Sequence, residues 1–267
     1  MRLFKTLRTQ RPSFSEADGS ISLAAPKSWT DLSQEQLHYV LTLLATFSDA
    51  TVVKTYMLVR FSGIHVLRKD RYGWICWMRS SWWRKKRFFT VQAWQIQCLL
   101  EQLAYIDSYE SMDVRLWEVD GFHAVDRLLH GVRFIDYLNA EKYYQAYNVN
   151  NDGRMIEKLA SILYRDKKGK IPARIRLSPG ELLGVYLWYA HIKSVFSREF
   201  PNFFKRLPPD ETADFDILKA MNTQIRALTD GDVTKEQEIY NIDCWRALTE
   251  LDQKAREAEE FKKRMKK

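Results

Sequence analysis

The segment SPGELLGVYLWYAHIKSVF (178–196) decides the expected fold, because it is the most apolar helix that the sequence predicts. Ser178 and Pro179 form a typical helix start, since serine caps free amide groups and proline is tolerated in the first turn. Apolar residues lie on nearly all sides of this helix, which is typical of a helix at the centre of a domain. They are Leu182, Leu183, Val185, Tyr186, Leu187, Trp188, Ile192, Val195 and Phe196.

Shorter amphipathic helices are predicted on the N-terminal side of this segment. Ser33 opens the first of them, with Gln36 three residues later completing a capping-box pattern. Apolar residues then recur at helical spacing in several further stretches. The expected helices cover residues 33–47, 51–61, 93–106, 124–130, 134–147 and 153–164, with a brief strand at 114–119.

The periodicity changes between the second and third of these helices. Ile64–Leu67 and Trp74–Met78 are short, β-prone runs, and a polar segment that contains Gly73 separates them. This pattern predicts an antiparallel β-hairpin with a longer loop. Phe88–Val91 is expected to add a third strand, so that the β structure lies near residues 64–91.

A change of composition marks the C-terminal region. The segment RLPPDETAD (206–214) is typical of a linker, and a helical hairpin is predicted over 215–267, with its second helix starting at Thr234. Residues 1–29 lack helical periodicity and are expected to form an irregular arm. The sequence therefore predicts an α+β fold, predominantly α-helical, with a main helical domain at 30–205 that contains the small antiparallel β-hairpin.

The positive charge of the chain is concentrated in the predicted hairpin. The formal net charge is +8, and between Arg68 and Arg87 eight basic residues face one acid, Asp70. Cations interleaved with aromatic residues are typical of surfaces that bind single-stranded nucleic acid, so residues 68–89 are a candidate nucleic-acid site. An anionic protein surface would fit equally well, and a core of aromatics beneath a solvated basic turn is the structural alternative. The candidate residues are Arg79, Trp82, Trp83, Arg84, Lys85, Lys86 and Arg87.

The second helix of the C-terminal hairpin has a long apolar stripe. Its members are Trp245, Leu248, Leu251, Ala255, Ala258 and Phe261. The helix is longer than its predicted neighbour, so the stripe from Leu251 onward is expected to need cover from the main domain or from a protein partner. Tryptophan is frequent among interface anchors, which favours a partner-binding surface here. The alternative is that Trp245 packs inside the hairpin, against Met221 and Ile225.

Sequence patterns for catalysis or metal binding do not converge. The three cysteines are far apart, and HExxH, GxGxxG, GxSxG and Walker patterns are absent. Asn148–Gly153 imitates the start of a calcium loop, but Leu159 stands where the bidentate glutamate belongs, so a helix-capping turn is expected instead. His123 and His130 share no third ligand. We therefore expect a protein that is not an enzyme and that uses no cofactor and no metal.

Four stretches resemble a family found in the structural and tail gene modules of tailed phages and prophages of Bacteroidetes. They are KTYMLVRFSGI (54–64), LLHGVRFIDYLNAEKYYQAY (128–147), LGVYLWYAHIKSVFSREFPNFF (183–204) and QIRALTDGDVTKEQEIYNIDCWRALTELDQKAREAEE (224–260). The resemblance implies a role in virion assembly, as a tail assembly chaperone or a minor structural component. It implies a protein partner, such as a tape-measure or other tail protein, and leaves self-association open.

The N-terminal segment MRLFKTLRTQRPSFS is basic but has no apolar run long enough for a signal peptide. The longest apolar run, Leu182–Ala190, is too short to cross a bilayer, which takes about 20 residues. We therefore expect no contact with a membrane and a location in the host bacterial cytoplasm, with association with the virion left open.

Overall fold

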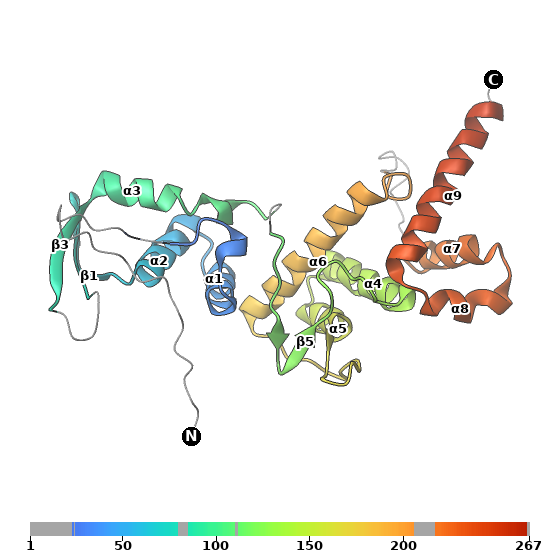
Figure 1. The fold of residues 1–267 in the computed structure, drawn as a ribbon, viewed down its shortest axis with the longest axis horizontal. Coiled ribbons are helices and arrows are strands. Elements are labelled where there is room, and N and C mark those ends of the chain that lie inside the picture. The colour runs from blue at the N-terminus through green and yellow to red at the C-terminus, as the bar shows by residue number, and fades with distance from the viewer. Residues whose placement is uncertain (1–22, 24, 80–84, 110–111, 206–216, 266–267) are drawn as a thin grey trace. The chain divides into compact units, whose positions relative to one another are not determined.

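The computed structural model describes residues 23, 25–79, 85–109, 112–205 and 217–265 (Figure 1). The chain divides into two compact units, unit 1 over Met1–Ser111 and unit 2 over Met112–Lys267. The division after Ser111 falls inside the range 30–205, which the sequence predicts as one domain. The described residues form nine α-helices and two three-stranded antiparallel sheets. The predicted fold class, α+β and predominantly α-helical, is thereby confirmed.

Unit 1 combines three helices with one sheet. The Ser33 hydroxyl accepts a hydrogen bond from Gln36 N at 3.2 Å, and the Gln36 side chain accepts one from Ser33 N at 2.9 Å, so the predicted capping box is confirmed. Gly63 ends the second helix in the left-handed conformation, at φ 67°. The elements are η1 (Trp29–Asp31), α1 (Gln34–Thr46), α2 (Ala50–Ser62), β1 (His65–Asp70), β2 (Gly73–Met78), β3 (Arg87–Gln92), α3 (Ala93–Glu101) and η2 (Ala104–Asp107).

The sheet of unit 1 has the order β1-β2-β3, and both of its strand pairs are antiparallel. The predicted hairpin and its third strand are thus confirmed. One face of the sheet packs against α3 and contributes to the core of unit 1. The buried residues of this inner face are Trp74, Cys76, Met78 and Val91, and α3 adds Ile96.

Gly73 allows β2 and β3 to approach closely at one end of the sheet. Its φ is 150°, and a Cβ atom at this position would lie 2.1 Å from the carbonyl oxygen of Val91. Real Cβ atoms do not approach a backbone oxygen so closely, so only glycine fits without a shift of a strand.

Unit 2 is built around α6 (Pro179–Glu199), which carries the most apolar segment of the sequence. Trp188, Tyr189 and Phe196 on this helix are fully buried, as its apolar pattern predicts. The Trp188 indole N–H donates to the carbonyl oxygen of Arg127 at 2.9 Å, which joins the helix to the loop before α4. The other elements are β4 (Glu118–Val119), β5 (Phe122–Ala124), α4 (Phe134–Asn150), α5 (Gly153–Leu163), β6 (Tyr164–Arg165), α7 (Ile217–Thr229), η4 (Val233–Lys235), α8 (Glu236–Asn241) and α9 (Cys244–Met265).

The helix predicted at 124–130 is wrong. Residues 122–124 form β5, which pairs with β4 and β6 in the second sheet. The following residues form a turn, because the Asp126 carboxylate accepts from the backbone N–H groups of Leu128 at 3.0 Å and His130 at 3.2 Å. Short acidic side chains often replace helical hydrogen bonds in this way. Leu129 then takes the left-handed conformation at φ 66°.

The single helix predicted from Thr234 onward is also wrong, because the chain breaks at Ile242 and Asp243 into α8 and α9. The Asp243 carboxylate accepts from Trp245 N at 2.9 Å and so caps α9. The backbone at the break pairs with the start of α4: Phe134 N donates to Ile242 O at 2.8 Å. Cys244 N donates to Val132 O at 2.9 Å.

The stretch that imitates a calcium loop joins α4 to α5 as a pair of helix caps. Asn151 ends α4 in the left-handed conformation at φ 51°. The Asp152 carboxylate accepts from Arg154 N at 3.0 Å and caps α5. The capping turn that the sequence favours is confirmed.

Candidate binding surfaces

The outer face of the unit 1 sheet is the first candidate surface. Successive side chains of a strand point to opposite faces of a sheet, so the buried positions Trp74, Cys76 and Met78 place Ile75 and Trp77 on the other face. The strand register extends this face across β1 and β3. The outer sheet face therefore consists of His65, Arg68, Ile75, Trp77, Phe88 and Thr90.

An aromatic row crosses the three strands on this face. His65 pairs with Trp77, and Trp77 pairs with Phe88. The His65 and Trp77 rings stack with centroids 4.0 Å apart and planes inclined by 8°. The Phe88 side chain is 63% exposed. A bulge at Leu67 lets both His65 and Arg68 face outward, because it shifts the register by one residue between them.

Cations surround this aromatic row. The Lys86 ammonium nitrogen lies 4.2 Å from the ring centroid of Trp77, and the Arg79 guanidinium carbon lies 6.0 Å from it. Asp70 is the only acidic residue between 65 and 92, and its carboxylate accepts from the backbone N–H groups of Tyr72 and Gly73 at the β1–β2 turn. The exposed described cations of this region are Arg68, Lys69, Arg71, Arg79, Lys85, Lys86 and Arg87.

The basic aromatic set that the sequence predicts is partly described. Arg79, Lys85, Lys86 and Arg87 are exposed around the sheet. Trp82, Trp83 and Arg84 lie outside the described residues. The named candidate residues did not include Arg68 and Phe88, although both lie within the predicted range 68–89, and His65 lies outside that range. Alternation along β3 is the sequence signal that places Phe88 and Phe89 on opposite faces.

Trp245, the first residue of the predicted partner-binding stripe, packs within unit 2. Its ring stacks on His130 at 4.5 Å and meets the edges of Phe196 at 5.3 Å and Phe200 at 5.4 Å. Its indole N–H donates to Leu128 O at 2.6 Å. The half-buried Trp245 side chain thus joins α9 to α6 within unit 2.

The next stripe residues are covered as well. Leu248 and Leu251 are buried, and Leu251 is only 4% exposed. The segment after α6 lies against α9, because the Asp252 carboxylate accepts from Asn202 N at 2.7 Å, Asn202 Nδ2 at 2.8 Å and Phe203 N at 2.9 Å. Of the two kinds of cover that the sequence left open for the stripe from Leu251 onward, the protein's own chain supplies that of Leu251, and Ala255 is half-buried.

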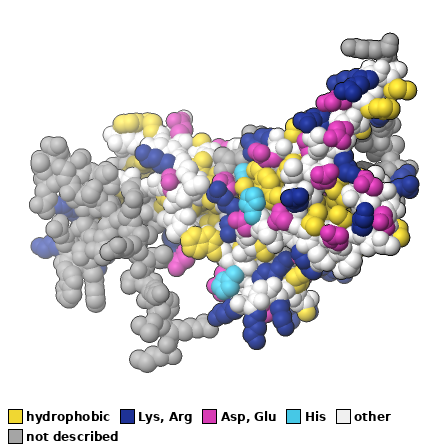
Figure 2. All heavy atoms as spheres, turned by 45° about the vertical axis from the view of Figure 1, so that its right-hand side comes forward, with side chains coloured by type: hydrophobic (Ala, Val, Ile, Leu, Met, Phe, Trp, Pro, Cys, Tyr) yellow, Lys and Arg dark blue, Asp and Glu magenta, His cyan; other side chains and the backbone are white. Residues whose placement is uncertain are grey.

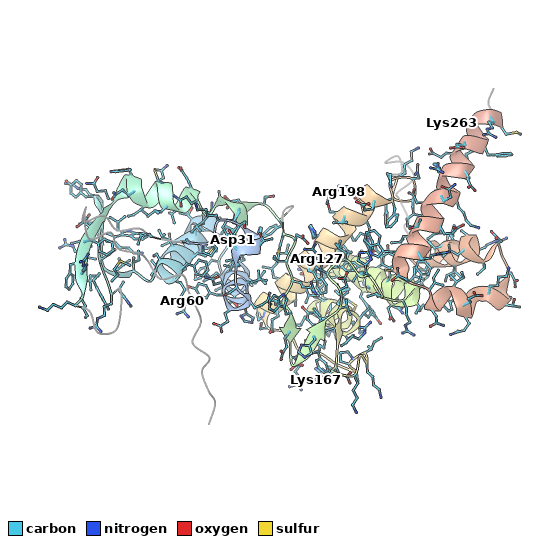
Figure 3. The ribbon with its side chains drawn as sticks, viewed as in Figure 1. Asp31, Arg60, Arg127, Lys167, Arg198 and Lys263 are labelled. Carbon is cyan, nitrogen blue, oxygen red and sulfur yellow. The ribbon has the colours of Figure 1, made fainter. Side chains whose placement is uncertain are left out.

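Beyond these contacts α9 continues as an exposed helix. Ala258 is exposed, Phe261 is 64% exposed and Met265 is 74% exposed. We call residues 258–265 the α9 tip. The last ion pair that joins α9 to another segment in the described part of unit 2 is between Lys205 and Glu259. Hydrophobic and basic side chains gather at this end of the helix in Figure 2, and Figure 3 labels Lys263 there.

Two carboxylates of unit 2, those of Asp136 and Glu141, are paired with cations, which is typical of structural roles. The Asp136 carboxylate binds Arg133 at 3.0 Å and Arg165 at 3.4 Å. Glu141 forms an ion pair with Lys193 and accepts from the Tyr189 hydroxyl at 3.3 Å. Burial raises the pKa of Tyr189 well above its usual value, so the hydroxyl stays a hydrogen-bond donor.

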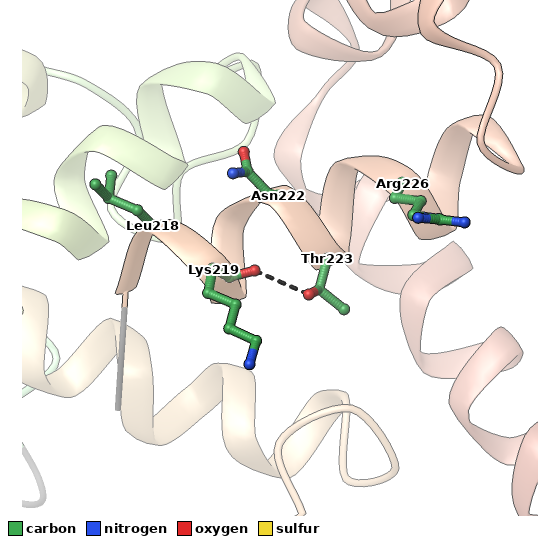
Figure 4. A pocket seen from close by; sticks show the side chains of 5 residues that line it. All are labelled: Leu218, Lys219, Asn222, Thr223 and Arg226. Atoms are coloured by element: carbon green, nitrogen blue, oxygen red, sulfur yellow. Dashed lines mark hydrogen bonds between the residues drawn. The ribbon is translucent and has the colours of Figure 1, made fainter. Parts of the chain in front are cut away.

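Among the described residues we find no site that is formed to hold a small ligand or a metal. The open hollow on α7 shown in Figure 4 is lined by Leu218, Lys219, Asn222, Thr223 and Arg226. Thr223 donates to Lys219 O at 2.8 Å, a bond within the helix. Among the described residues, no three His, Cys, Asp or Glu side chains converge as metal ligands.

Comparisons with known proteins add no relative, since no protein-family model, no curated protein and no solved structure matches the chain. Within the described part of the chain, each helix is too short or too polar to cross a membrane.

Proposed function

We propose that the protein is a non-enzymatic assembly protein of tailed phages, which acts by binding another protein of the virion or its tail. The observation that carries the protein contact is the α9 tip, where the apolar stripe of the described residues continues beyond the buried Leu251 to the exposed Phe261 and Met265. The phage context rests on the four stretches that resemble tail-module proteins of Bacteroidetes phages and prophages.

The partner that this surface fits best is an amphipathic helix. Residues three or four apart lie on one side of a helix, so Ala258, Phe261 and Met265 form one apolar strip. Such a strip is suited to packing against a partner's helix or groove, and long helical proteins such as tape-measure proteins offer many apolar stripes. Lys262, Lys263 and Arg264 flank the strip and favour a partner with acidic residues beside its apolar ones.

The test is co-expression of the full chain with the tape-measure protein of the same phage module, followed by measurement of the dissociation constant of the complex. We expect Phe261→Ala to weaken the complex about tenfold or more, because it removes an aromatic anchor of a kind that often contributes 2 kcal/mol. Deletion of residues 260–267 is expected to abolish it. Phe88→Ala is the matched control, since Phe88 is as exposed as Phe261 but lies in unit 1.

Two results would overturn this assignment. Equal binding by the full chain, Phe261→Ala and the deletion variant would show that the α9 tip is not the contact. Sedimentation that shows a dimer for the full chain and a monomer for the deletion variant, with no tail protein bound, would replace the tail partner by a second copy of the chain.

A further inference from the structure

We infer that the outer sheet face of unit 1 binds single-stranded nucleic acid, with bases stacked on its aromatic row and phosphates held by the cations around it. This site lies in unit 1 and uses none of the residues of the α9 tip. A test of this site is therefore independent of a test of the proposed assembly contact. Three features of the face support the inference: exposed ring surface, unbalanced charge and the position of its stacking platforms.

The outer sheet face exposes the surface of aromatic rings to solvent. Antiparallel sheets usually keep apolar side chains on the face that packs on the core and polar ones on the solvated face. Here the core face is supplied by Trp74, Cys76 and Met78, yet the solvated face carries Ile75, Trp77 and Phe88 as well. Apolar and aromatic residues on both faces of a small sheet indicate that the outer one meets a partner.

The positive charge between residues 65 and 92 favours an anionic partner. Seven described cations between residues 65 and 92 are exposed, of which Arg68 faces outward in the register and Arg79 and Lys86 lie beside the Trp77 ring. The single acid of that range, Asp70, already accepts two backbone hydrogen bonds in a turn. A polyanion neutralises such a cluster and releases its own counterions on binding. Lys86 and Arg79 lie close to the Trp77 ring, so charge and ring surface are at the same place on the sheet.

The aromatic row leaves two places for unpaired bases to stack. The Trp77 ring in the middle is stacked on His65 and has Lys86 beside it, so the ring surface available to bases is that of the exposed Phe88 on β3 and of His65 on β1. Nucleotides in a duplex hide their ring faces, and therefore only a single strand can use Phe88 and His65 as stacking platforms. An acidic protein surface would satisfy the cations as well, but exposed rings beside cations favour bases, whose faces stack on aromatic side chains.

The experiment measures fluorescence anisotropy of labelled oligo-dT and oligo-U, each about 20 nucleotides long, with the full chain at about 50 mM and 200 mM salt. The wild-type protein should bind both, more tightly than duplex DNA of equal length, with affinity falling steeply as salt rises. Phe88→Ala should lower the affinity for the single strands about fivefold to a hundredfold, because it removes one stacking platform. Phe261→Ala is the matched aromatic control and should leave the affinity unchanged.

Lys86→Ala tests the phosphate contact separately. It should weaken binding to oligo-dT and oligo-U alike and lower the slope of log affinity against log salt by about 1. Lys167→Ala, at an exposed lysine of unit 2 labelled in Figure 3, is the matched control and should change neither quantity. Circular dichroism of all variants at the same concentration shows whether each retains the fold.

Three outcomes would each overturn the inference. The first is no binding of either oligonucleotide at about 50 mM salt, where phosphate contacts are strongest. The second is equal affinity for single strands and duplex with no effect of Phe88→Ala, which would mean binding by charge alone. The third is tighter binding of polyglutamate than of oligo-dT, which would assign the face to an acidic protein.

Discussion

The outer sheet face and the α9 tip each expose a phenylalanine to the same extent, but the two side chains are held in different ways. Phe88 is fixed by strand pairing on one side and by the buried inner face of the sheet beneath it. Phe261 lies on α9 beyond the last ion pair that joins this helix to another described segment of unit 2, and its side chain is 64% exposed. The sheet face is therefore organised before binding, whereas the last turns of a single helix fray and must be ordered by the partner.

The buried cysteines make this comparison measurable. Cys76 lies beneath the sheet of unit 1, and Cys244 lies at the start of α9 in unit 2. Burial raises the pKa of both thiols, that of Cys244 to about 12, so neither is reactive in the folded protein. Cys98 is exposed. The rate of thiol labelling at Cys76 and at Cys244 thus reports the opening of each unit separately.

The largest effect is expected from Trp245→Ala, which should lower the free energy of unfolding of unit 2 by about 3 kcal/mol. The substitution removes the ring contacts with Phe196 and Phe200 and leaves the Leu128 carbonyl without its indole donor. Labelling of Cys244 should accelerate while that of Cys76 stays slow. A stable variant that only loses a protein partner would restore the sequence-based assignment of Trp245 to an interface.

Gly73→Ala is the corresponding substitution in unit 1 and should lower the free energy of unfolding of that unit by about 2 kcal/mol. The added methyl group would meet the Val91 carbonyl oxygen, so β2 and β3 must separate. Gly63→Ala is the matched control, because its φ is also positive but nothing lies within 4 Å of the added carbon. It should lower the free energy of unfolding by about 1 kcal/mol. Thiol labelling should accelerate at Cys76 alone, and equal costs for the two variants would contradict the close-approach argument.

Asp252→Ala should have the smallest effect and lower the free energy of unfolding of unit 2 by about 1–2 kcal/mol. It leaves the backbone N–H groups of Asn202 and Phe203 without their acceptor and loosens the segment that covers α9. The melting temperature of unit 2 should fall modestly, and deletion of 260–267 should leave it unchanged. If the deletion lowered the melting temperature more than Asp252→Ala does, the α9 tip would be packed on its own unit and the proposed contact would lose its support.

What could be predicted from the sequence was local. The capping box at Ser33 and the apolar segment after Ser178 predict their helices because the decisive groups lie within a few residues of one another. The predictions failed where distant segments decide the conformation. The break before α9 depends on pairing with the start of α4, and the segment after α6 is joined to Asp252 of α9 by hydrogen bonds that span 50 residues.

The candidate surfaces follow the same rule. The basic aromatic composition of 68–89 indicated a binding site, but the row of His65, Trp77 and Phe88 arises only from strand register, including the bulge at Leu67. Period-two alternation places a residue on a face of a sheet, yet it does not say which residue of the next strand lies beside it. The α9 stripe was visible as a pattern, while its division into a covered and an exposed part was not.

The pairing of the loop before α4 with the start of α9 also sets an order of events during synthesis. The Leu128 carbonyl accepts from the Trp245 indole across 117 positions of the chain, and Gly131 N donates to Asp243 across 112. A ribosome that adds about 5–20 residues per second needs roughly 6–24 seconds to synthesise the residues between them. The loop before α4 lacks its hydrogen-bond partners for that time. Unit 1 has all of its residues by then, which allows its sheet to form first. Unit 2 can close only after the start of α9 has been made.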